Sequence, residues 1–285
     1  MTNNALSVDV EDYFQVSAFS RNIRRADWDG FPLRVEDNTR RLLDLFQESG
    51  VHATFFVLGW VAERLPALVR EIAAQGHEIA SHGYSHELVY NQGPDDFRAE
   101  TLRSKHLLED IVQQPVRGYR AASYSITAQS QWALDILAEA GFTYDSSIYP
   151  VYHDRYGMPG TPAHPYILRT PNGSSLVEFP LSTANILGYR LPVSGGGYFR
   201  IYPYALSRMG LAQVNRRRQP FIFYLHPWEI DPGQPRVSTG LLSRFRHYHN
   251  LDKCESRLRC LLQDFRFGTV RDVLVDLGLQ ADGDR

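Results

Sequence analysis

The sequence predicts an α/β fold: a distorted (β/α)7-type barrel of parallel strands with a mostly helical C-terminal extension. Short β-prone segments alternate about seven times with segments of helical spacing, which is typical of parallel strands joined by crossover helices. The 285 residues are close to the roughly 250 of a single α/β barrel. We therefore predict one domain over residues 1–285, with a core at about 5–230 and a C-terminal extension at 231–285 packed on the barrel.

The predicted strands are short apolar runs bounded by glycine, proline or polar residues. The clearest are HATFFVL and PFIFYLH, which are rich in aromatic and other β-prone side chains. The strands are expected at residues 5–9, 52–58, 77–81, 118–120, 142–145, 176–181, 220–226 and 265–267.

The predicted helices have apolar residues at intervals of three and four. Two of them open with proline, and Gly50, Gly76 and Gly141 each follow the end of one. A segment rich in proline, tyrosine and glycine, 149–170, is expected to form a long loop. The helices are expected at residues 34–49, 66–75, 94–112, 131–140 and 204–215.

Composition excludes several classes of protein. With 30 basic and 32 acidic residues the formal net charge is −2, so no basic footprint of nucleic-acid binding is present. No segment approaches the roughly 20 apolar residues of a membrane span, and the first residues do not resemble a signal peptide. We expect a cytoplasmic protein with no nucleic-acid partner and no integral membrane segment. The oligomeric state is not indicated.

Chemically versatile side chains lie at the ends of the predicted strands. Asp9, His82, Arg120, Asp145 and His226 each lie at or just after the C-terminal end of one strand. In a parallel barrel these ends converge on one face, where active sites form. The sequence therefore predicts that five residues far apart in the chain meet in one pocket.

Two of these strand ends carry groups that suit a metal ion. Asp9, Glu11 and Asp12 are three carboxylates that repel one another unless a cation, a basic partner or a proton is present; a solvated acidic loop is the alternative. His82 and His86 are four residues apart and can converge on one metal ion, although this spacing alone is only moderately specific. By themselves, the other strand-end residues are more typical of core packing or salt bridges.

Taken together, these segments resemble the polysaccharide deacetylase family, the carbohydrate esterases that include chitooligosaccharide, chitin and peptidoglycan deacetylases. The most specific stretch is GHEIASHGYSH at 76–86, which is similar to the family's metal-binding motif almost letter for letter. HATFFVLG resembles the family's strand after the first helix. RAASY at 120–124, YDSS at 144–147 and LH at 225–226 resemble the arginine, later aspartate and acid-histidine motifs.

The C-terminal part has a resemblance of its own. SGGGYFR at 194–200, HPWEIDPGQP at 226–235 and RHYHNL at 246–251 resemble a subgroup associated with bacterial exopolysaccharide and exosortase gene clusters. That subgroup carries an additional region after the deacetylase core. This resemblance implies that the substrate is a bacterial exopolysaccharide or its precursor.

The chain departs from the family pattern in two places. The first motif usually has two adjacent aspartates, whereas the order here is Asp-Val-Glu-Asp. Some members use an acid-x-acid arrangement, which makes Asp9 the base and Glu11 the metal ligand, with Asp12 as the rival ligand. The arginine motif has Ala121 and Ala122 where the family carries proline, so this loop is expected to be less rigid.

The resemblance implies a metal-dependent hydrolase that removes N-acetyl groups from the amino sugars of an N-acetylated polysaccharide or oligosaccharide. The expected cofactor is one divalent ion, first of all Zn²⁺, with Co²⁺, Ni²⁺ and Mn²⁺ as alternatives. It would be held by Glu11, His82 and His86 and would activate a water molecule. Asp9 would accept the proton of that water as general base, and His226 would protonate the departing amine.

The resemblance also implies roles for the residues around this site. Arg120 would hold Asp9, Asp145 would pair with His226, and a backbone N–H near Tyr124 would stabilise the oxyanion. Aromatic side chains near the motifs suit the apolar faces of sugar rings, although core packing is the alternative for each of them. The predicted sugar contacts are Tyr124, Tyr84 and Trp228.

Two other functions remain open at this point. A small-amide hydrolase, acting on a ureide or an imide, would use the same barrel but would not need a groove open at both ends. A catalytically silent sugar-binding protein would use the scaffold alone. Asp9 and His226 argue against the second alternative, because binding requires neither a base nor an acid.

Overall fold

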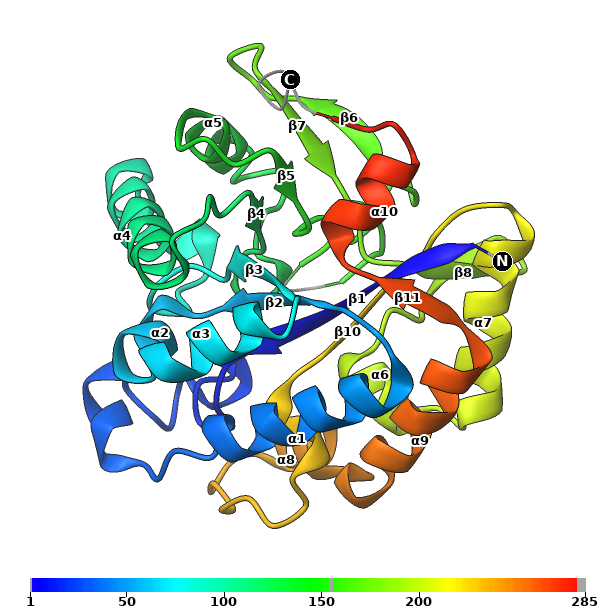
Figure 1. Cartoon of the computed structure of the whole chain (residues 1–285), viewed down its shortest axis with the longest axis horizontal. Helices are drawn as coiled ribbons and strands as arrows, with labels where there is room; N and C mark the ends of the chain where they lie inside the picture. The colour runs from blue at the N-terminus through cyan, green and yellow to red at the C-terminus, as the bar shows by residue number, and fades with distance from the viewer. Residues whose placement is uncertain (1, 154–155, 281–285) are drawn as a thin grey trace.

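The computed structural model describes residues 2–153 and 156–280. Its centre is a curled, mostly parallel sheet with helices around the outer side (Figure 1). The strands of this sheet are β1 (Asn3–Val10), β2 (Thr54–Val57), β3 (Glu78–Ser81), β4 (Gly118–Tyr119), β5 (Tyr144–Asp145), β6 (Tyr166–Arg169), β7 (Ser175–Glu178), β10 (Ile222–Leu225) and β11 (Arg266–Gly268).

The strand order is β10-β1-β2-β3-β4-β5-β7-β6, with β11 beside β1. All neighbours are parallel except β6, which runs antiparallel to β7. Within the described part of the chain, the two end strands β10 and β6 do not pair with each other, so the barrel is open along this side. The C-terminal ends of β1, β2, β3, β4, β5, β7 and β10 all lie at one edge, as the predicted parallel fold requires.

The helices predicted from apolar spacing are present with small changes at their ends. Proline occupies the first turn of α3 and α4, and Gly50 ends α1 in the left-handed conformation, with φ of 62°. The helices are α1 (Val35–Ser49), α2 (Gly59–Arg64), α3 (Pro66–Ala74), α4 (Pro94–Val112), α5 (Trp132–Glu139), α6 (Gly196–Ile201), α7 (Tyr204–Arg216), α8 (Leu241–Tyr248), α9 (Leu251–Asp264) and α10 (Val270–Asp276).

Two layers of buried side chains hold this arrangement together. Successive strand residues point to opposite faces of the sheet. Phe55 of β2 therefore packs in the larger layer between the sheet and the outer helices, whereas its neighbour Phe56 points into the barrel. The inner layer is unusually polar, because the guanidinium of Arg120 lies 4.0 Å from the Phe56 ring and is completely buried. The barrel interior is thus built around a charge that needs partners.

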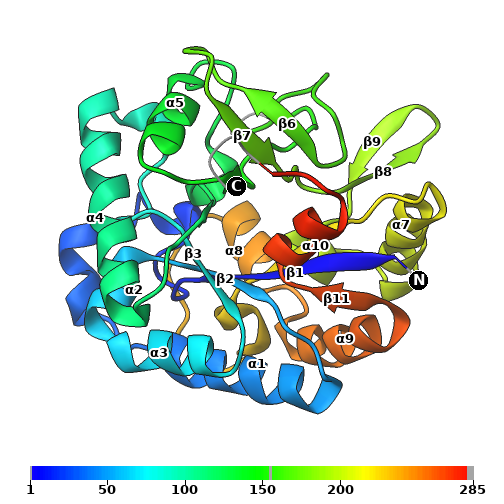
Figure 2. The same cartoon turned by 45° about the horizontal axis from the view of Figure 1, so that its top comes forward.

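The structure differs from the sequence prediction at residues 149–170. This segment is not a loop throughout, because its end forms β6, an edge strand whose alternating half-buried and exposed residues pair with β7. A hairpin of β8 (Thr183–Ile186) and β9 (Tyr189–Pro192) follows β7 and was not predicted. Figure 2 shows this hairpin standing away from the main sheet. Both elements are partly exposed at the edge, so they lack the apolar runs that reveal buried strands.

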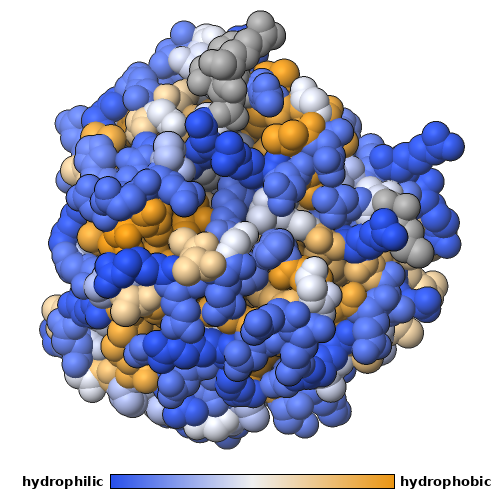
Figure 3. All heavy atoms as spheres, viewed as in Figure 1, coloured by the Kyte–Doolittle hydropathy of each residue, from blue (hydrophilic) through white to orange (hydrophobic). Residues whose placement is uncertain are grey.

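The region predicted as an extension contributes to the sheet itself. β11 pairs with the start of β1, with Asn4 opposite Phe267. Helix α9 packs against α1 and against the 3-10 helix η5 (Pro227–Ile230) that follows β10. None of the helices in the described residues has both the length and the apolar character needed to cross a bilayer. The face in Figure 3 is mostly hydrophilic, with apolar residues in separate patches.

A glycine-rich segment runs along the free edge of β10. Gly195 forms a parallel bridge with Tyr224, and the Tyr224 amide donates to the Ser194 carbonyl over 2.7 Å. A Cβ atom at Gly195 would lie 1.9 Å from the Tyr224 carbonyl oxygen, and the residue has φ of +124°. Only glycine fits this approach, which brings the following helix α6 against the C-terminal edge of the sheet.

Candidate active site

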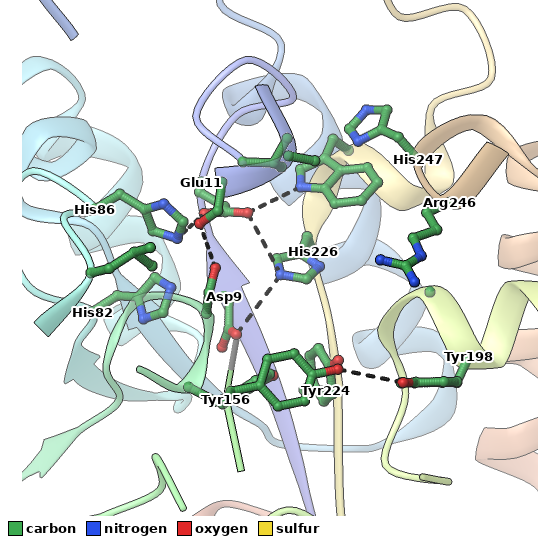
Figure 4. Close-up of a pocket in the computed structure, with 18 of the residues that line it drawn as sticks. Asp9, Glu11, His82, His86, Tyr156, Tyr198, Tyr224, His226, Arg246 and His247 are labelled. Atoms are coloured by element: carbon green, nitrogen blue, oxygen red, sulfur yellow. Dashed lines mark hydrogen bonds and ion pairs between the residues drawn. The ribbon is translucent and has the colours of Figure 1, made fainter. Parts of the chain in front are cut away.

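A cavity of about 420 Å³ opens at the C-terminal edge of the strands. One wall comes from the ends of β1 and β3, and the other from β10, α6 and α8 (Figure 4). Its polar and aromatic lining includes Asp9, Glu11, His82, His86, Tyr124, His153, Tyr156, Tyr198, Arg200, Tyr224, His226, Trp228, Arg246 and His247.

Asp9 is held in this cavity by Arg120. A terminal nitrogen of Arg120, Nη1, donates to Asp9 Oδ1 over 2.6 Å and to the Ser7 hydroxyl over 2.9 Å. The other guanidinium nitrogens donate to the carbonyl and the hydroxyl of Ser146. A fully buried guanidinium is stable only when its donors are used in this way. Because Asp9 Oδ1 is occupied, Oδ2 is the oxygen that faces the cavity, 3.9 Å from His226 Nε2.

Glu11, His82 and His86 form the candidate metal centre. Each offers one ligand atom, and these atoms lie within 4.8 Å of one another. Glu11 Oε2 is 2.7 Å from His86 Nε2. His82 Nδ1 lies 2.8 Å from the Arg120 carbonyl, so Nδ1 carries the proton and Nε2 keeps its lone pair for a ligand. Figure 4 shows both imidazoles on the same side of Glu11.

The donor set fits a divalent ion of the zinc type. Burial lowers the pKa of His82 to about 4, which keeps this imidazole neutral as a ligand must be. Burial alone would raise the pKa of Glu11, but the charges of His86, His226 and His82 and the hydrogen bond from His86 together outweigh it and bring the pKa to about 2, so the carboxylate is ionised. His86 adopts a left-handed backbone with φ of 54°, at a cost of about 1 kcal/mol. Two imidazole nitrogens and one carboxylate oxygen leave positions open for water, as in catalytic zinc sites.

His226 faces this centre from β10. Its Nε2 lies 3.6 Å from Glu11 Oε1, and its side chain is 17% exposed toward the cavity. On its other side, Nδ1 lies 3.3 Å from Glu229 Oε2. Burial lowers the pKa of His226, but the hydrogen bond to Glu229 and the charges of Glu11, Glu229 and Asp9 outweigh it and raise the pKa to about 9. His226 is therefore a protonated acid near neutral pH.

Glu229, and not Asp145, is the carboxylate beside His226. The sequence prediction assigned this role to Asp145, but the two oxygens of Asp145 accept from the hydroxyl and the amide of Ser147. Asp145 lies beside the buried Glu178, and it does not line the cavity. Burial raises the pKa of both carboxyl groups, and the neighbouring charge of Asp145 raises that of Glu178 further. Asp145 thus belongs to a buried pair of acids beneath the site.

Arg200 holds Glu229 in place. The two form a buried ion pair, with Nε donating to Glu229 Oε1 over 2.7 Å. The remaining guanidinium donors bind the carbonyl oxygens of residues 246, 247 and 249. Arg200 therefore connects the partner of His226 to the start of the predicted C-terminal extension.

The structure also separates the two rival ligands of the acidic motif. Asp12 turns away from the cavity and accepts from the backbone N–H groups of Tyr13, Arg34 and Val35 at 2.7 to 2.9 Å. It thereby satisfies the first free amides of α1 from another part of the chain. Glu11 is the acid that joins the two histidines.

The three predicted sugar contacts are placed differently. Tyr124 and Trp228 line the cavity, and Trp228 Nε1 donates to Glu11 Oε1 over 3.4 Å. Tyr84 does not, because its hydroxyl donates to Glu63 over 2.6 Å and Arg103 lies over its ring on the outside of the barrel. The Tyr124 amide is already bonded to the carbonyl of Ala121, so this amide is not the free donor expected for an oxyanion.

Fold and site together define an α/β barrel protein with three features at the C-terminal edge of its strands. They are an acid–His–His centre, an aspartate held by a buried arginine, and a protonated histidine. Residues 27–144 match the profile of the polysaccharide deacetylase family, and residues 146–275 match that of a domain of unknown function, DUF3473. The chain therefore contains a polysaccharide deacetylase domain. Asp9 and Glu11 precede the matched range.

Related proteins agree with this assignment. A peptidoglycan-N-acetylglucosamine deacetylase of Bacillus cereus is 37% identical over 74 residues, which cover 26% of this chain and 27% of the relative. A chitooligosaccharide deacetylase of Bradyrhizobium sp. is 31% identical over 100 residues, which cover 35% and 43%. The chain thus spans less than half the length of these relatives. The crystal structure of a proposed polysaccharide deacetylase from Mycobacterium smegmatis shares the fold, with a TM-score of 0.64 and 24% identity over 98% of this chain and 91% of that one.

Sequence reasoning missed several residues that position or surround His226. Glu229 stands three positions after His226, the distance at which a side chain in a helical turn reaches back to the preceding residue. That spacing was a usable signal. Arg200 and Arg246 lie in two of the stretches that resemble the C-terminal subgroup, but that resemblance gave them no role, because both reach the cavity only through the packing of α6 and α8.

Proposed function

We propose that this protein hydrolyses the acetamido group of N-acetylated amino sugars in a polysaccharide or oligosaccharide, with a divalent ion, Zn²⁺ in the first place, as cofactor. One observation carries the proposal. Asp9, oriented by Arg120, and His226, protonated beside Glu229, face the same cavity next to the Glu11, His82 and His86 centre. A base, an acid and a cluster of metal-ligand type are the three parts that amide hydrolysis requires.

The chain's own residues account for the proton transfers. Bound at Glu11, His82 and His86, a divalent ion would supply Lewis acidity for the water and for the acetyl carbonyl. Asp9 Oδ2 takes a proton from the attacking water while the water oxygen bonds to the carbonyl carbon. His226 Nε2 then gives its proton to the nitrogen as the carbon–nitrogen bond breaks. The products are the free amine and acetic acid, whose proton passes to the amine or to solvent to leave acetate. The proton held by Asp9 returns His226 to its starting form.

The cavity suits a sugar as the carrier of the acetamide. Aromatic rings of Trp228, Tyr124, Tyr156 and Tyr198 form much of its lining. Trp228 and His226 are stacked, with ring centroids 5.0 Å apart. Flat apolar faces with phenolic hydroxyls at their rims match the faces and hydroxyl groups of pyranose rings. The family of the relatives supports the same substrate class, and a bacterial exopolysaccharide remains our preferred source of it.

The test is release of acetate from N-acetylglucosamine oligomers by the purified, metal-loaded protein. We expect turnover that stops with a chelator and returns on adding Zn²⁺, and losses of at least about a thousandfold in kcat for Asp9→Asn and His82→Ala. Matched controls are Asp44→Asn and His106→Ala, which change exposed residues outside the cavity and should retain full activity.

Other outcomes would redirect the assignment. Unchanged activity in Asp9→Asn would remove the base from this mechanism, and turnover insensitive to chelator would remove the ion. Hydrolysis of a ureide such as allantoin in place of the oligomers would favour the small-amide alternative. Binding of the oligomers without any acetate release would favour a silent sugar-binding protein.

A further inference from the structure

The cavity contains a cation that the deacetylation chemistry does not use. Arg246, in the exposed helix α8, lines the same cavity as the catalytic groups. Figure 4 shows its guanidinium directed into the cavity near Tyr198, on the side of His226 opposite to the Glu11 and His86 cluster. The Tyr156 and Tyr198 hydroxyls, 3.4 Å apart, lie at this end as well.

The other charges of the site are already matched. Asp9 pairs with Arg120, Glu229 pairs with Arg200, and Glu11 faces the two imidazoles of the candidate metal centre. Within the described ranges, no carboxylate forms an ion pair with Arg246. The sequence from 232 to 251 contains three arginines and no aspartate or glutamate. Arg246 therefore brings a positive charge to the cavity that no described acid of the protein neutralises.

The backbone of Arg246 is held in place by a hydrogen bond from Arg200. Its carbonyl oxygen accepts from Arg200 Nη2 over 2.9 Å, and Arg200 is also bound to the carboxylate that holds His226. Arg244, two residues earlier on the same helix, is exposed and does not line the cavity. The backbone that carries Arg246 is thus anchored to the catalytic acid, whereas Arg244 has no such relation to the site.

We propose that Arg246, with the Tyr156 and Tyr198 hydroxyls, binds an anionic group of the substrate, so that the preferred substrate is an acidic N-acetylated glycan. This inference rests on the proposed function. The anion would be a carboxylate or a phosphate on the N-acetyl sugar or on its neighbour, since both present paired oxygens to the fork of an arginine. The phenolic hydroxyls supply further donors at the same place.

The experiment compares three substrates at equal concentration of the metal-loaded protein. They are neutral N-acetylglucosamine oligomers, oligomers in which N-acetylglucosamine alternates with glucuronic acid, and N-acetylglucosamine 1-phosphate. We expect kcat/KM for one of the two acidic substrates to exceed that of the neutral oligomer by about tenfold or more. The substrate that is preferred distinguishes a carboxylate from a phosphate.

Variants assign the preference to the residue. Arg246→Gln should reduce the ratio of acidic to neutral kcat/KM by about tenfold, through KM rather than kcat. Arg244→Gln is the matched control and should leave the ratio as in the wild type. The preference should also weaken with added salt, because an arginine–anion contact in an open cavity is screened. An equal ratio in wild type and Arg246→Gln would overturn the proposal.

Failure of the proposed function would be recognised separately. If no substrate released acetate, deacetylation would be refuted, while calorimetric binding of the same three compounds would still test the anion site. Tighter binding of an acidic compound, lost in Arg246→Gln and kept in Arg244→Gln, would support it. Equal binding of all three compounds, or acetate release without preference for an acidic one, would contradict it.

Discussion

Glu229 determines whether His226 can act as an acid. The two residues are joined within one turn of η5, and the charge of Glu229 helps to raise the pKa of His226 to about 9. The acid form of His226 is thus present below pH 9 and is lost as the pH rises through that value. Asp145 and Glu178, by contrast, are buried in the barrel interior and do not line the cavity.

Glu229→Gln should move the basic limb of the kcat/KM profile to lower pH by about one unit or more, because a carboxylate charge beside the imidazole is removed. We expect kcat/KM at pH 8 to fall about twofold or more, since a one-unit shift from a pKa of about 9 leaves half of His226 protonated at that pH. Asp145→Asn is the comparison, and it should leave the position of the limb unchanged. A limb that moves in Asp145→Asn and not in Glu229→Gln would restore the partner implied by the sequence.

The two acids of the first motif have separate tasks, and their variants should separate in the same way. Glu11→Gln should abolish binding of Zn²⁺ while the free energy of unfolding of the metal-free protein changes little. Asp12→Ala should lower that free energy by about 2 kcal/mol, because two backbone amides at the start of α1 and the amide of Tyr13 lose their acceptor. Isothermal titration with Zn²⁺ and urea unfolding measure the two effects. Loss of metal binding in Asp12→Ala alone would contradict the assignment.

Among the elements, the strands with apolar runs and the helices with regular spacing could be predicted from the sequence. The runs around β2 and β10 are buried on both faces and read as continuous apolar segments. The short β4 and β5 were found only approximately, since two residues carry no periodicity. The hairpin of β8 and β9 and the edge strand β6 are partly exposed, so no burial pattern marks them.

The site was predictable where its residues lie at strand ends and not where they come from helices. Asp9, His82 and His226 follow strands, so the parallel topology alone brings them together. Arg200 and Arg246 reach the cavity through packing of α6 and α8, which depends on long-range contacts and has no local signature. The direction of the Tyr84 side chain also depends on long-range contacts, with Glu63 in α2 and Arg103 in α4.

A hydrogen bond just before strand β3, far from the cavity, should make the stability of the protein depend on pH. His77, just before β3, accepts the Ala53 amide at Nδ1, and burial lowers its pKa to about 4. In the unfolded chain His77 has a pKa near 6.5, so between pH 6.5 and 4 it binds a proton there but not in the folded protein. The free energy of unfolding therefore falls as the pH drops from 6.5 toward 4. Urea midpoints at pH 7.5 and 5 should differ less in His77→Gln than in the wild type. An equal difference in both would exclude this residue.

At the scale of the whole molecule, both regions that match separate family profiles contribute residues to the lining of the cavity. His82 and Tyr124 come from residues 27–144, and His226 and Arg246 from residues 146–275. Because β11 pairs with β1 and α9 packs on α1, we propose that these regions form one cooperative unit. Calorimetry should show a single unfolding transition whose calorimetric and van't Hoff enthalpies agree. Two resolved transitions would instead indicate separable domains.

The bridge between Gly195 and Tyr224 makes the acid side of the barrel dependent on one residue that has no side chain. Any Cβ there would collide with the Tyr224 carbonyl and push α6 outward, and Arg200 and Tyr198 would move with it. Such a replacement would leave every proton donor, acceptor and metal ligand chemically intact. A natural variant at this position would therefore keep all of these side chains and still be inactive in the proposed reaction.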